Sequence, residues 1–247
     1  MSTITQVCDE LELYLEHDIL QLVNDFQDAS ELVSLFLHAD YRGGRRGQLL
    51  SRSRLLMMAQ FPSWFSKIIV AEIRGISNDD GTSPFWDSLG RYFFDMDFLE
   101  ADYLTTIKGK QFIADLMPKY PIYVDLLRDK AKDVIGKPHP NAAPALHLLE
   151  KERFKFRNYI DIFDGGPLIE CFFEDIKTVS DSQECTISQC EKEIKSEESF
   201  MICNTQEDFR LTTGKLKVTD NQEVCLTDDV AKVLNVTVGD KVRFVAF

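Results

Sequence analysis

A short segment rich in glycine and arginine, residues 42–47 (RGGRRG), constrains this chain more than any other part of its sequence. An apolar run at residues 31–37 (ELVSLFL) precedes it and predicts a strand. The residues that follow, QLLSRSRLLMMAQF, carry apolar side chains at helical spacing and predict a helix of about 14 residues that begins near Gly47. Residues 67–73 (KIIVAEI) then indicate a strand buried on both faces. This order of strand, glycine-rich turn, helix and strand predicts a βαβ unit.

The chemistry of residues 42–47 favours an anion site. Glycine lets backbone N–H groups turn toward one point and lets a ligand approach closely. The start of a helix adds partial positive charge, and the arginines add full charges. The segment is neither a P-loop, which needs Gly-Lys-Ser/Thr, nor a GxGxxG fingerprint. We therefore predict a cradle for a pyrophosphate, with a solvated basic turn as the alternative. The residues of this cradle are Arg42, Gly43, Gly44, Arg45, Arg46 and Gly47.

His139 is the second residue whose setting suggests chemistry. Pro138 and Pro140 flank it and restrict its backbone, so a loop of this kind can hold an imidazole in place. Histidine titrates near neutral pH and is the residue most often used in proton transfer. The alternative is an ordinary histidine of a surface loop, which from the residues alone is the commoner case.

Charge and composition exclude several classes of protein. The chain of 247 residues has 41 acidic and 28 basic side chains, a net charge of −13. Nucleic-acid binding needs a basic footprint, so we expect no nucleic-acid partner. No stretch approaches the roughly 18 apolar residues of a membrane span, and the N-terminus lacks the pattern of a signal peptide. We therefore expect no membrane partner and a cytoplasmic location.

The six cysteines are spread along the chain and form no disulfide framework. We expect free thiols in a reducing compartment. Cys185 and Cys190 lie close together in sequence, but no further ligand residues accompany them. The sequence therefore predicts no metal site.

Composition divides the chain into three parts. Residues 1–175 alternate apolar runs with helical patterns and predict one domain. Residues 176–199 are acidic and rich in Ser and Gln, which is typical of a linker. Residues 200–247 predict a small β-rich cap with a short helix at residues 228–234.

Local signals predict two further elements within the first part. The apolar runs at residues 18–24 and 31–37 surround a polar turn and predict a β-hairpin. Ser83 followed by Pro84 predicts the start of a helix, because serine caps helices and proline is tolerated at the first helical position.

Residues 42–47 also resemble the acyl-CoA-binding motif of GNAT-type N-acyltransferases, Arg/Gln-x-x-Gly-x-Gly/Ala, with Arg45 in place of the central glycine. Longer stretches are more specific, among them SPFWDSLGRYFFDMDFLEADYL, FIADLMPKYPIY, VIGKPHPNAAPAL and NYIDIFDGGP. Together these stretches resemble the arginine N-succinyltransferase family, closely over residues 8–175 and loosely over the tail. The resemblance implies an α+β fold, with a GNAT-like mixed sheet, flanking helices and a small β-rich C-terminal subdomain.

The resemblance also implies a reaction. The family transfers the succinyl group of succinyl-CoA to the α-amine of L-arginine in arginine catabolism. Succinyl-CoA is then a co-substrate, L-arginine is the acceptor, and no permanently bound cofactor or metal is expected. A homo- or hetero-oligomer is consistent with the resemblance.

Residue roles follow from the same resemblance. Leu35 matches the family's succinyl-CoA contact, and His139 matches its proton donor, which reverses the preference for an ordinary loop histidine. Backbone N–H groups near Leu35 are expected to stabilise the oxyanion of an acyl transfer. That part of the predicted site is formed by Leu35, Phe36 and Leu37. An acceptor guanidinium calls for carboxylates, for which the candidates are Glu72, Asp95 and Asp164.

The chain departs from the family at two places. Arg153 stands where the family has glycine at a helix end, and a left-handed conformation there costs a non-glycine residue roughly 1 kcal/mol. The chain is also expected to be N-terminally truncated, without roughly the first hundred residues of the family and its first strands, which predicts an open hydrophobic sheet edge. Two alternatives therefore stay open: a non-catalytic subunit that retains CoA binding, and an acyltransferase with another acyl-CoA and amine.

Overall fold

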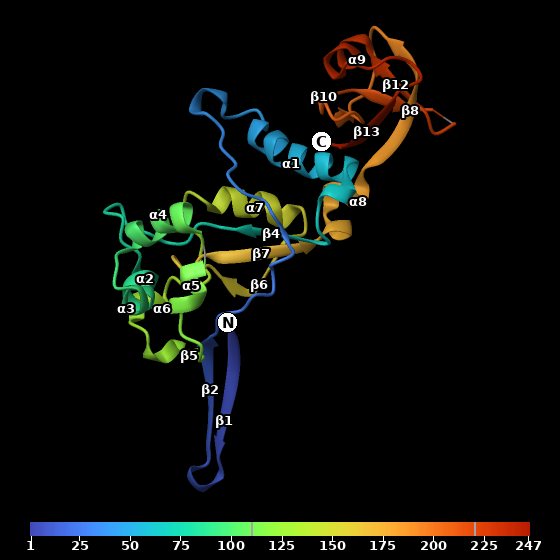
Figure 1. The fold of residues 1–247 in the computed structure, drawn as a ribbon. Helices are drawn as coiled ribbons and strands as arrows, with labels where there is room; N and C mark the ends of the chain where they lie inside the picture. The colour runs from blue at the N-terminus through green and yellow to red at the C-terminus, as the bar shows by residue number, and fades with distance from the viewer. Residues whose placement is uncertain (110, 220) are drawn as a thin grey trace. The chain divides into compact units, whose positions relative to one another are not determined.

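The computed structural model describes residues 1–109, 111–219 and 221–247, which form two compact units (Figure 1). The first unit comprises residues 1–33, 68–150 and 154–171, and the second comprises residues 34–67, 151–153 and 172–247. Among the helices of the described residues, none combines the length and the apolar character that crossing a bilayer requires.

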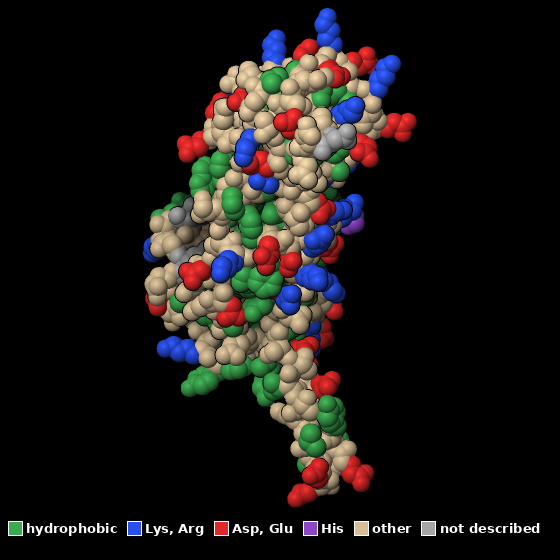
Figure 2. Space-filling model, turned by 90° about the vertical axis from the view of Figure 1, so that its right-hand side faces the viewer, with side chains coloured by type: hydrophobic (Ala, Val, Ile, Leu, Met, Phe, Trp, Pro, Cys, Tyr) green, Lys and Arg blue, Asp and Glu red, His purple; other side chains and the backbone are tan. Residues whose placement is uncertain are grey.

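The first unit begins with a long antiparallel hairpin of β1 (Ser2–Cys8) and β2 (Leu13–Leu20). The end of β2 also pairs with the short β5 (Ile122–Tyr123). Figure 1 shows the hairpin as a dark blue arm, and Figure 2 shows apolar side chains in green along it. The predicted hairpin of residues 18–37 is wrong, because the residues that pair lie in the first twenty. Both faces of this hairpin are largely exposed, so its strands lack the alternation of apolar and polar residues by which a half-buried strand is predicted.

A second, mixed sheet of the first unit has the strand order β3-β4-β7-β6. Its strands are β3 (Ser30–Glu31), β4 (Ile68–Glu72), β7 (Pro167–Phe172) and β6 (Lys155–Ile160). β3 and β4 are parallel, as the βαβ prediction requires, and β6 and β7 are antiparallel. The predicted strand at residues 31–37 is too long, because the chain leaves the sheet after Glu31 and Ser34 adopts a left-handed conformation with φ of 53°. A left-handed residue cannot continue a pleated strand.

Short helices pack around these sheets. They are α2 (Pro84–Ser88), α3 (Gly90–Phe94), α4 (Phe98–Lys108), α5 (Gln111–Leu116), α6 (Asp129–Lys132) and α7 (Ala143–Lys151). The predicted start at Ser83 is confirmed, since its hydroxyl accepts a hydrogen bond from the N–H of Trp86 at 3.3 Å. Phe85 and Trp86 are fully buried and anchor two neighbouring apolar clusters. Single turns of 3-10 helix occur at Asp9–Leu11, Ala39–Tyr41, Pro62–Trp64, Val124–Leu126 and Phe173–Asp175.

The second unit contains α1 (Arg46–Gln60), close to the predicted helix, and a six-stranded sheet of order β10-β9-β13-β8-β12-β11. The strands are β8 (Gln183–Glu191), β9 (Phe200–Asn204), β10 (Leu211–Gly214), β11 (Leu216–Val218), β12 (Val224–Thr227) and β13 (Lys241–Ala246). The helix α9 (Asp228–Leu234) lies where a helix was predicted. The acidic stretch predicted as a linker contains α8 (Lys177–Asp181) and β8, so its polar composition conceals regular structure.

A buried ion pair holds part of the second unit together. Arg52 of α1 lies 3.0 Å from a carboxylate oxygen of Glu152, and both side chains are buried. Glu152 also accepts hydrogen bonds from the N–H and the hydroxyl of Thr178. A buried charge pair needs such additional partners to offset its desolvation, so we assign Glu152 and Arg52 a structural role.

Candidate active site

The glycine-rich segment makes a tight left-handed turn into α1. Gly43, Gly44 and Arg45 have φ angles of 96°, 56° and 63° in succession. A Cβ at Gly43 or Gly44 would meet no atom within 4 Å, so glycine is favoured there by its backbone conformation and not by lack of space. The side chains of this turn are exposed, and α1 has no acidic residue in its first turn. An exposed helix N-terminus next to arginines can bind an anion.

Two of the arginines already have partners within the second unit. The Arg42 Nε donates a hydrogen bond to the carbonyl of Leu37 at 3.4 Å. The Arg45 Nε donates to the side chain of Gln48 at 3.0 Å, and its guanidinium lies 4.1 Å from the ring centroid of Phe247. These contacts hold the guanidinium groups of Arg42 and Arg45 close to the backbone of the turn. Arg46 occupies the first position of α1.

The segment predicted as a strand end lies beside this turn. Leu35 and Phe36 are exposed, at 38% and 74% of their surface, and neither belongs to a strand. Leu37 contacts the turn through the carbonyl that accepts from Arg42. The structure therefore brings Leu37 together with residues 42–47, but it does not place the N–H groups of residues 35–37 at a strand end.

His139 lies in the first unit, on a loop tied to the end of β4. Its N–H donates to the carbonyl of Arg74 at 2.8 Å, and Pro138 forms a β-bridge with Gly75. Its Nδ1 accepts the N–H of Asn141 at 3.1 Å. An imidazole whose Nδ1 accepts a hydrogen bond carries its proton on Nε2, so His139 offers Nε2–H to a reacting group.

Asp164 joins this loop to the turn that precedes β7. One of its carboxylate oxygens accepts the N–H of Gly75 at 2.6 Å, and the other accepts the N–H of Gly166 at 2.8 Å. Asp164 is buried, and both of its oxygens serve the backbone. This arrangement gives Asp164 a positioning role between the two turns. Asp95, the exposed C-cap of α3, lies outside the cavity described next.

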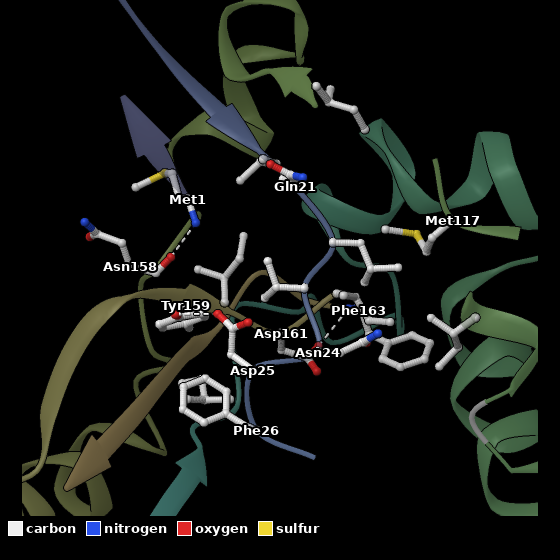
Figure 3. A pocket seen from close by; sticks show the side chains of 18 of the residues that line it. Met1, Gln21, Asn24, Asp25, Phe26, Met117, Asn158, Tyr159, Asp161 and Phe163 are labelled. Carbon is white, nitrogen blue, oxygen red and sulfur yellow. Dashed lines mark hydrogen bonds between the residues drawn. The ribbon is translucent and has the colours of Figure 1, made fainter. Parts of the chain in front are cut away.

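A cavity of about 560 Å³ opens in the first unit (Figure 3). Glu72 is one of the residues that line it. Figure 3 shows Asp25, Asp161, Tyr159 and Phe163 around it. Asp161, which the sequence analysis missed, accepts N–H groups from Phe163 at 2.7 Å and Asp164 at 3.0 Å. Burial, followed by the charges of Asp164 and Glu72, raises the pKa of Asp161 to about 7. Its only sequence signal is its position three residues before Asp164 in the stretch DIFDGG.

Within the described residues, no group of three or more His, Cys, Asp or Glu side chains could hold a metal ion. All six cysteines are free thiols. The first unit thus offers an imidazole, carboxylates and backbone N–H groups, and the second unit offers guanidinium groups at a helix N-terminus. Groups of these kinds serve acid–base and acyl-transfer chemistry.

Comparison with known proteins assigns the chain to a family. Residues 1–178 match the family model of the arginine N-succinyltransferase beta subunit, and residues 183–246 match the model of its C-terminal domain. The chain belongs to the arginine N-succinyltransferase family. It is 43% identical over 236 residues to arginine N-succinyltransferase subunit beta of Pseudomonas aeruginosa, covering 96% of this chain and 69% of the relative. It is 39% identical over 253 residues to arginine N-succinyltransferase of Yersinia pestis, covering all of this chain and 72% of that protein.

The fold of this family member agrees with a solved relative. The structure of arginine/ornithine succinyltransferase subunit AI from Pseudomonas aeruginosa has a TM-score of 0.85 and 34% sequence identity, and the match covers 99% of this chain and 71% of that one. The predicted α+β fold, GNAT-like with a small β-rich C-terminal subdomain, is confirmed. The family model matches the chain from residue 1, and the chain spans 69% to 72% of the length of these relatives.

Proposed function

We propose that this chain transfers the succinyl group of succinyl-CoA to the α-amine of L-arginine. The observation that carries this proposal is the 43% identity, over 96% of the chain, to a protein named arginine N-succinyltransferase subunit beta. The exposed basic turn at residues 42–47 and the Nε2–H of His139 are the groups that such a reaction needs. The name of the solved relative includes ornithine beside arginine, so this shorter amine is a second acceptor to test.

The reaction moves one proton and exchanges one bond. The deprotonated α-amine attacks the thioester carbonyl, a C–N bond forms, and the carbonyl oxygen becomes an oxyanion. The C–S bond then breaks, the oxyanion returns to a carbonyl, and the nitrogen gives up one proton while the sulfur gains one. In this proposal His139 gives its Nε2 proton to the departing sulfur, and the proton lost by the attacking nitrogen passes to the same Nε2, so the imidazole regains the proton that it gave.

The second unit supplies the groups for CoA. The N-terminus of α1 and the guanidinium groups of Arg42, Arg45 and Arg46 bind the pyrophosphate, since both carry positive charge. Leu35, Phe36 and Leu37 then contact the acyl end of succinyl-CoA. Support for this part is the contact of Leu37 with the basic turn.

The proposal includes the setting of the reaction. Succinyl-CoA acts as a co-substrate with no permanently bound cofactor, and a cytoplasmic location suits both the substrates and the free thiols. The first alternative, a non-catalytic subunit that keeps CoA binding, has the same fold and the same basic turn.

Arginine-dependent release of CoA tests the proposal directly. The free thiol is measured by a colorimetric thiol reagent after mixing the chain with succinyl-CoA, with and without L-arginine. We expect release only with both substrates, and slower release when acetyl-CoA replaces succinyl-CoA or ornithine replaces arginine. Binding of CoA without any arginine-dependent release would favour the non-catalytic alternative.

The role of His139 has its own test. Replacing a general acid typically lowers the rate by about 10²- to 10⁴-fold, so we expect His139→Ala to lower kcat in this range. His147→Ala is the matched control, because His147 is exposed on α7 and its nearest ion pair is a long one, 3.9 Å, to Glu150. Equal turnover of the two variants would reject the role of His139.

A further inference from the structure

Side chains of two kinds line the cavity of the first unit. The apolar ones, which we call its apolar wall, include Leu22, Phe26, Phe85, Ile113, Met117 and Phe163. Among the polar ones are the carboxylates of Asp25, Glu72 and Asp161. Its volume of about 560 Å³ lies within the range of small-molecule sites, about 300–1,000 Å³.

The charges of the lining side chains indicate that the cavity binds a cation rather than an anion. Asp25 accepts a hydrogen bond from the Tyr159 hydroxyl at 2.7 Å, and Arg157, at the rim, is paired with Glu170 at 2.9 Å. Carboxylates in a partly apolar hollow repel anions and stabilise a cation. Phe26 and Tyr159 also line the cavity, and an aromatic ring attracts a cation that lies over its face.

We propose that this cavity is the acceptor subsite, in which the guanidinium of arginine lies against Asp161 and Glu72 while its aliphatic stem contacts the apolar wall. This inference rests on the proposed function and adds the residues that recognise the acceptor. A planar guanidinium can donate two parallel hydrogen bonds to a carboxylate, so the subsite selects it over a neutral group of the same shape.

The contacts around Asp164 connect this cavity to His139. Asp161 accepts the N–H of Asp164, Asp164 accepts the N–H of Gly75, and Gly75 pairs with Pro138 next to His139. One hydrogen-bonded network of the first unit therefore holds both the cavity wall and the imidazole. Such a network fixes the distance and orientation between an amine bound in the cavity and the imidazole that supplies the proton.

Protonation of Asp161 supports the same assignment. Its pKa of about 7 means that a bound cation must displace a proton at lower pH. The charged groups that face it are Glu72 and Asp164, and Asp25, Tyr159 and Arg157 line the same cavity. Met1 lines it as well, and its N-terminal ammonium donates to the carbonyl of Asn158 at 2.6 Å. The affinity for arginine therefore rises with pH through the neutral range.

Asp161→Asn tests the subsite while preserving its geometry. Asparagine keeps an oxygen that can accept the N–H groups of Phe163 and Asp164, so the turn is retained. We expect KM for L-arginine to rise at least tenfold, while KM for succinyl-CoA changes less than twofold. The matched control is Asp102→Asn, the same change at an exposed residue of α4 that does not line the cavity. Glu72→Gln is the second variant, and a smaller rise in the same KM is expected.

Titration calorimetry with L-arginine and with L-citrulline, its neutral isostere, separates the subsite from the catalytic proposal. Arginine binding to the wild-type chain that is lost in Asp161→Asn, with little binding of citrulline, supports the subsite even if no acyl transfer occurs. Equal binding of arginine and citrulline, arginine binding unchanged in both variants, or no arginine binding to the wild-type chain would each overturn it.

Discussion

The carboxyl group of Asp161 contributes to the pH dependence of the stability of the unligated chain. Its pKa is about 7 in the folded chain and about 4 in an unfolded one, so between these values the folded state binds a proton that the unfolded state lacks. The contribution of Asp161 to stability therefore falls as pH rises from about 4 to about 7. We expect Asp161→Asn to gain stability relative to wild type by about 1 kcal/mol or more over this window. Chemical denaturation at pH 4.5 and pH 7.5 measures it, and a constant difference between the two proteins would contradict it.

The same residue predicts a pH effect on binding. With a pKa of about 7, the ionised fraction of Asp161 rises about tenfold between pH 6 and pH 8, and the affinity of the wild-type chain for arginine should rise by a similar factor. Calorimetry in buffers of different ionisation enthalpy should also detect proton release below pH 7. The Asp161→Asn variant should show neither effect, and a pH-dependent affinity in that variant would assign the titration to another group.

Arg153 illustrates a residue whose strain is compensated. It has a φ of 74°, a conformation that favours glycine, and its guanidinium donates to the carbonyl of Asp175 at 3.1 Å and to Ser180 at 3.2 Å. Arg153→Gly removes both the strain and these exposed hydrogen bonds, so we expect a change below about 1 kcal/mol. Arg153→Ala keeps the strain and loses the bonds, and should be the less stable of the two by about 1 kcal/mol in thermal denaturation.

At the scale of elements, the junction between the end of β4 and the turn before β7 depends on the absence of a side chain. A Cβ at Gly75 would lie 2.5 Å from an Asp164 oxygen and 2.6 Å from the N–H nitrogen of Gly166. We expect Gly75→Ala to lower the free energy of unfolding by about 1–3 kcal/mol, because the backbone must move and Asp164 loses its bonds. The control is Gly47→Ala in α1, where a Cβ would lie 3.8 Å from Leu37 and no loss is expected.

The hairpin of β1 and β2 leaves several of its apolar side chains exposed to solvent. Leu13, Tyr14 and Leu15 are 44%, 65% and 44% exposed. A two-stranded hairpin is at best marginally stable in water, and exposed apolar surface favours association. We therefore expect particles larger than one chain in sedimentation velocity at micromolar concentration. The double variant Leu13→Lys/Leu15→Lys should sediment as a single chain, and a monomeric wild type would contradict this prediction.

At the scale of the whole molecule, the two units divide the proposed work. His139 and the cavity belong to the first unit, and the basic turn belongs to the second. We expect Arg46→Ala to raise KM for succinyl-CoA alone and Asp161→Asn to raise KM for arginine alone. Because the two residues belong to different units and are proposed to bind different substrates, the effects of the double variant should multiply. A double variant with no more effect than one of the single variants would show that both residues act on one substrate.

The sequence determined those features that depend on neighbours along the chain. The helix at residues 46–60, the capped start at Ser83 and the strand at residues 68–72 all follow from local patterns. Family membership followed from ordered stretches of residues. Local backbone preferences and side-chain periodicity act over a few residues, so they can be predicted from the sequence alone.

Only the tertiary structure decided the features that depend on distant neighbours. The hairpin lies at residues 2–20 and not at the predicted residues 18–37. The strand predicted at residues 31–37 ends at Glu31 in the structure, and Asp164 accepts a hydrogen bond from the N–H of Gly75. The cavity and the raised pKa of Asp161 arise from burial among segments far apart in the chain. Desolvation and charge interactions depend on distances in space, and those distances are set by how the segments pack rather than by their order.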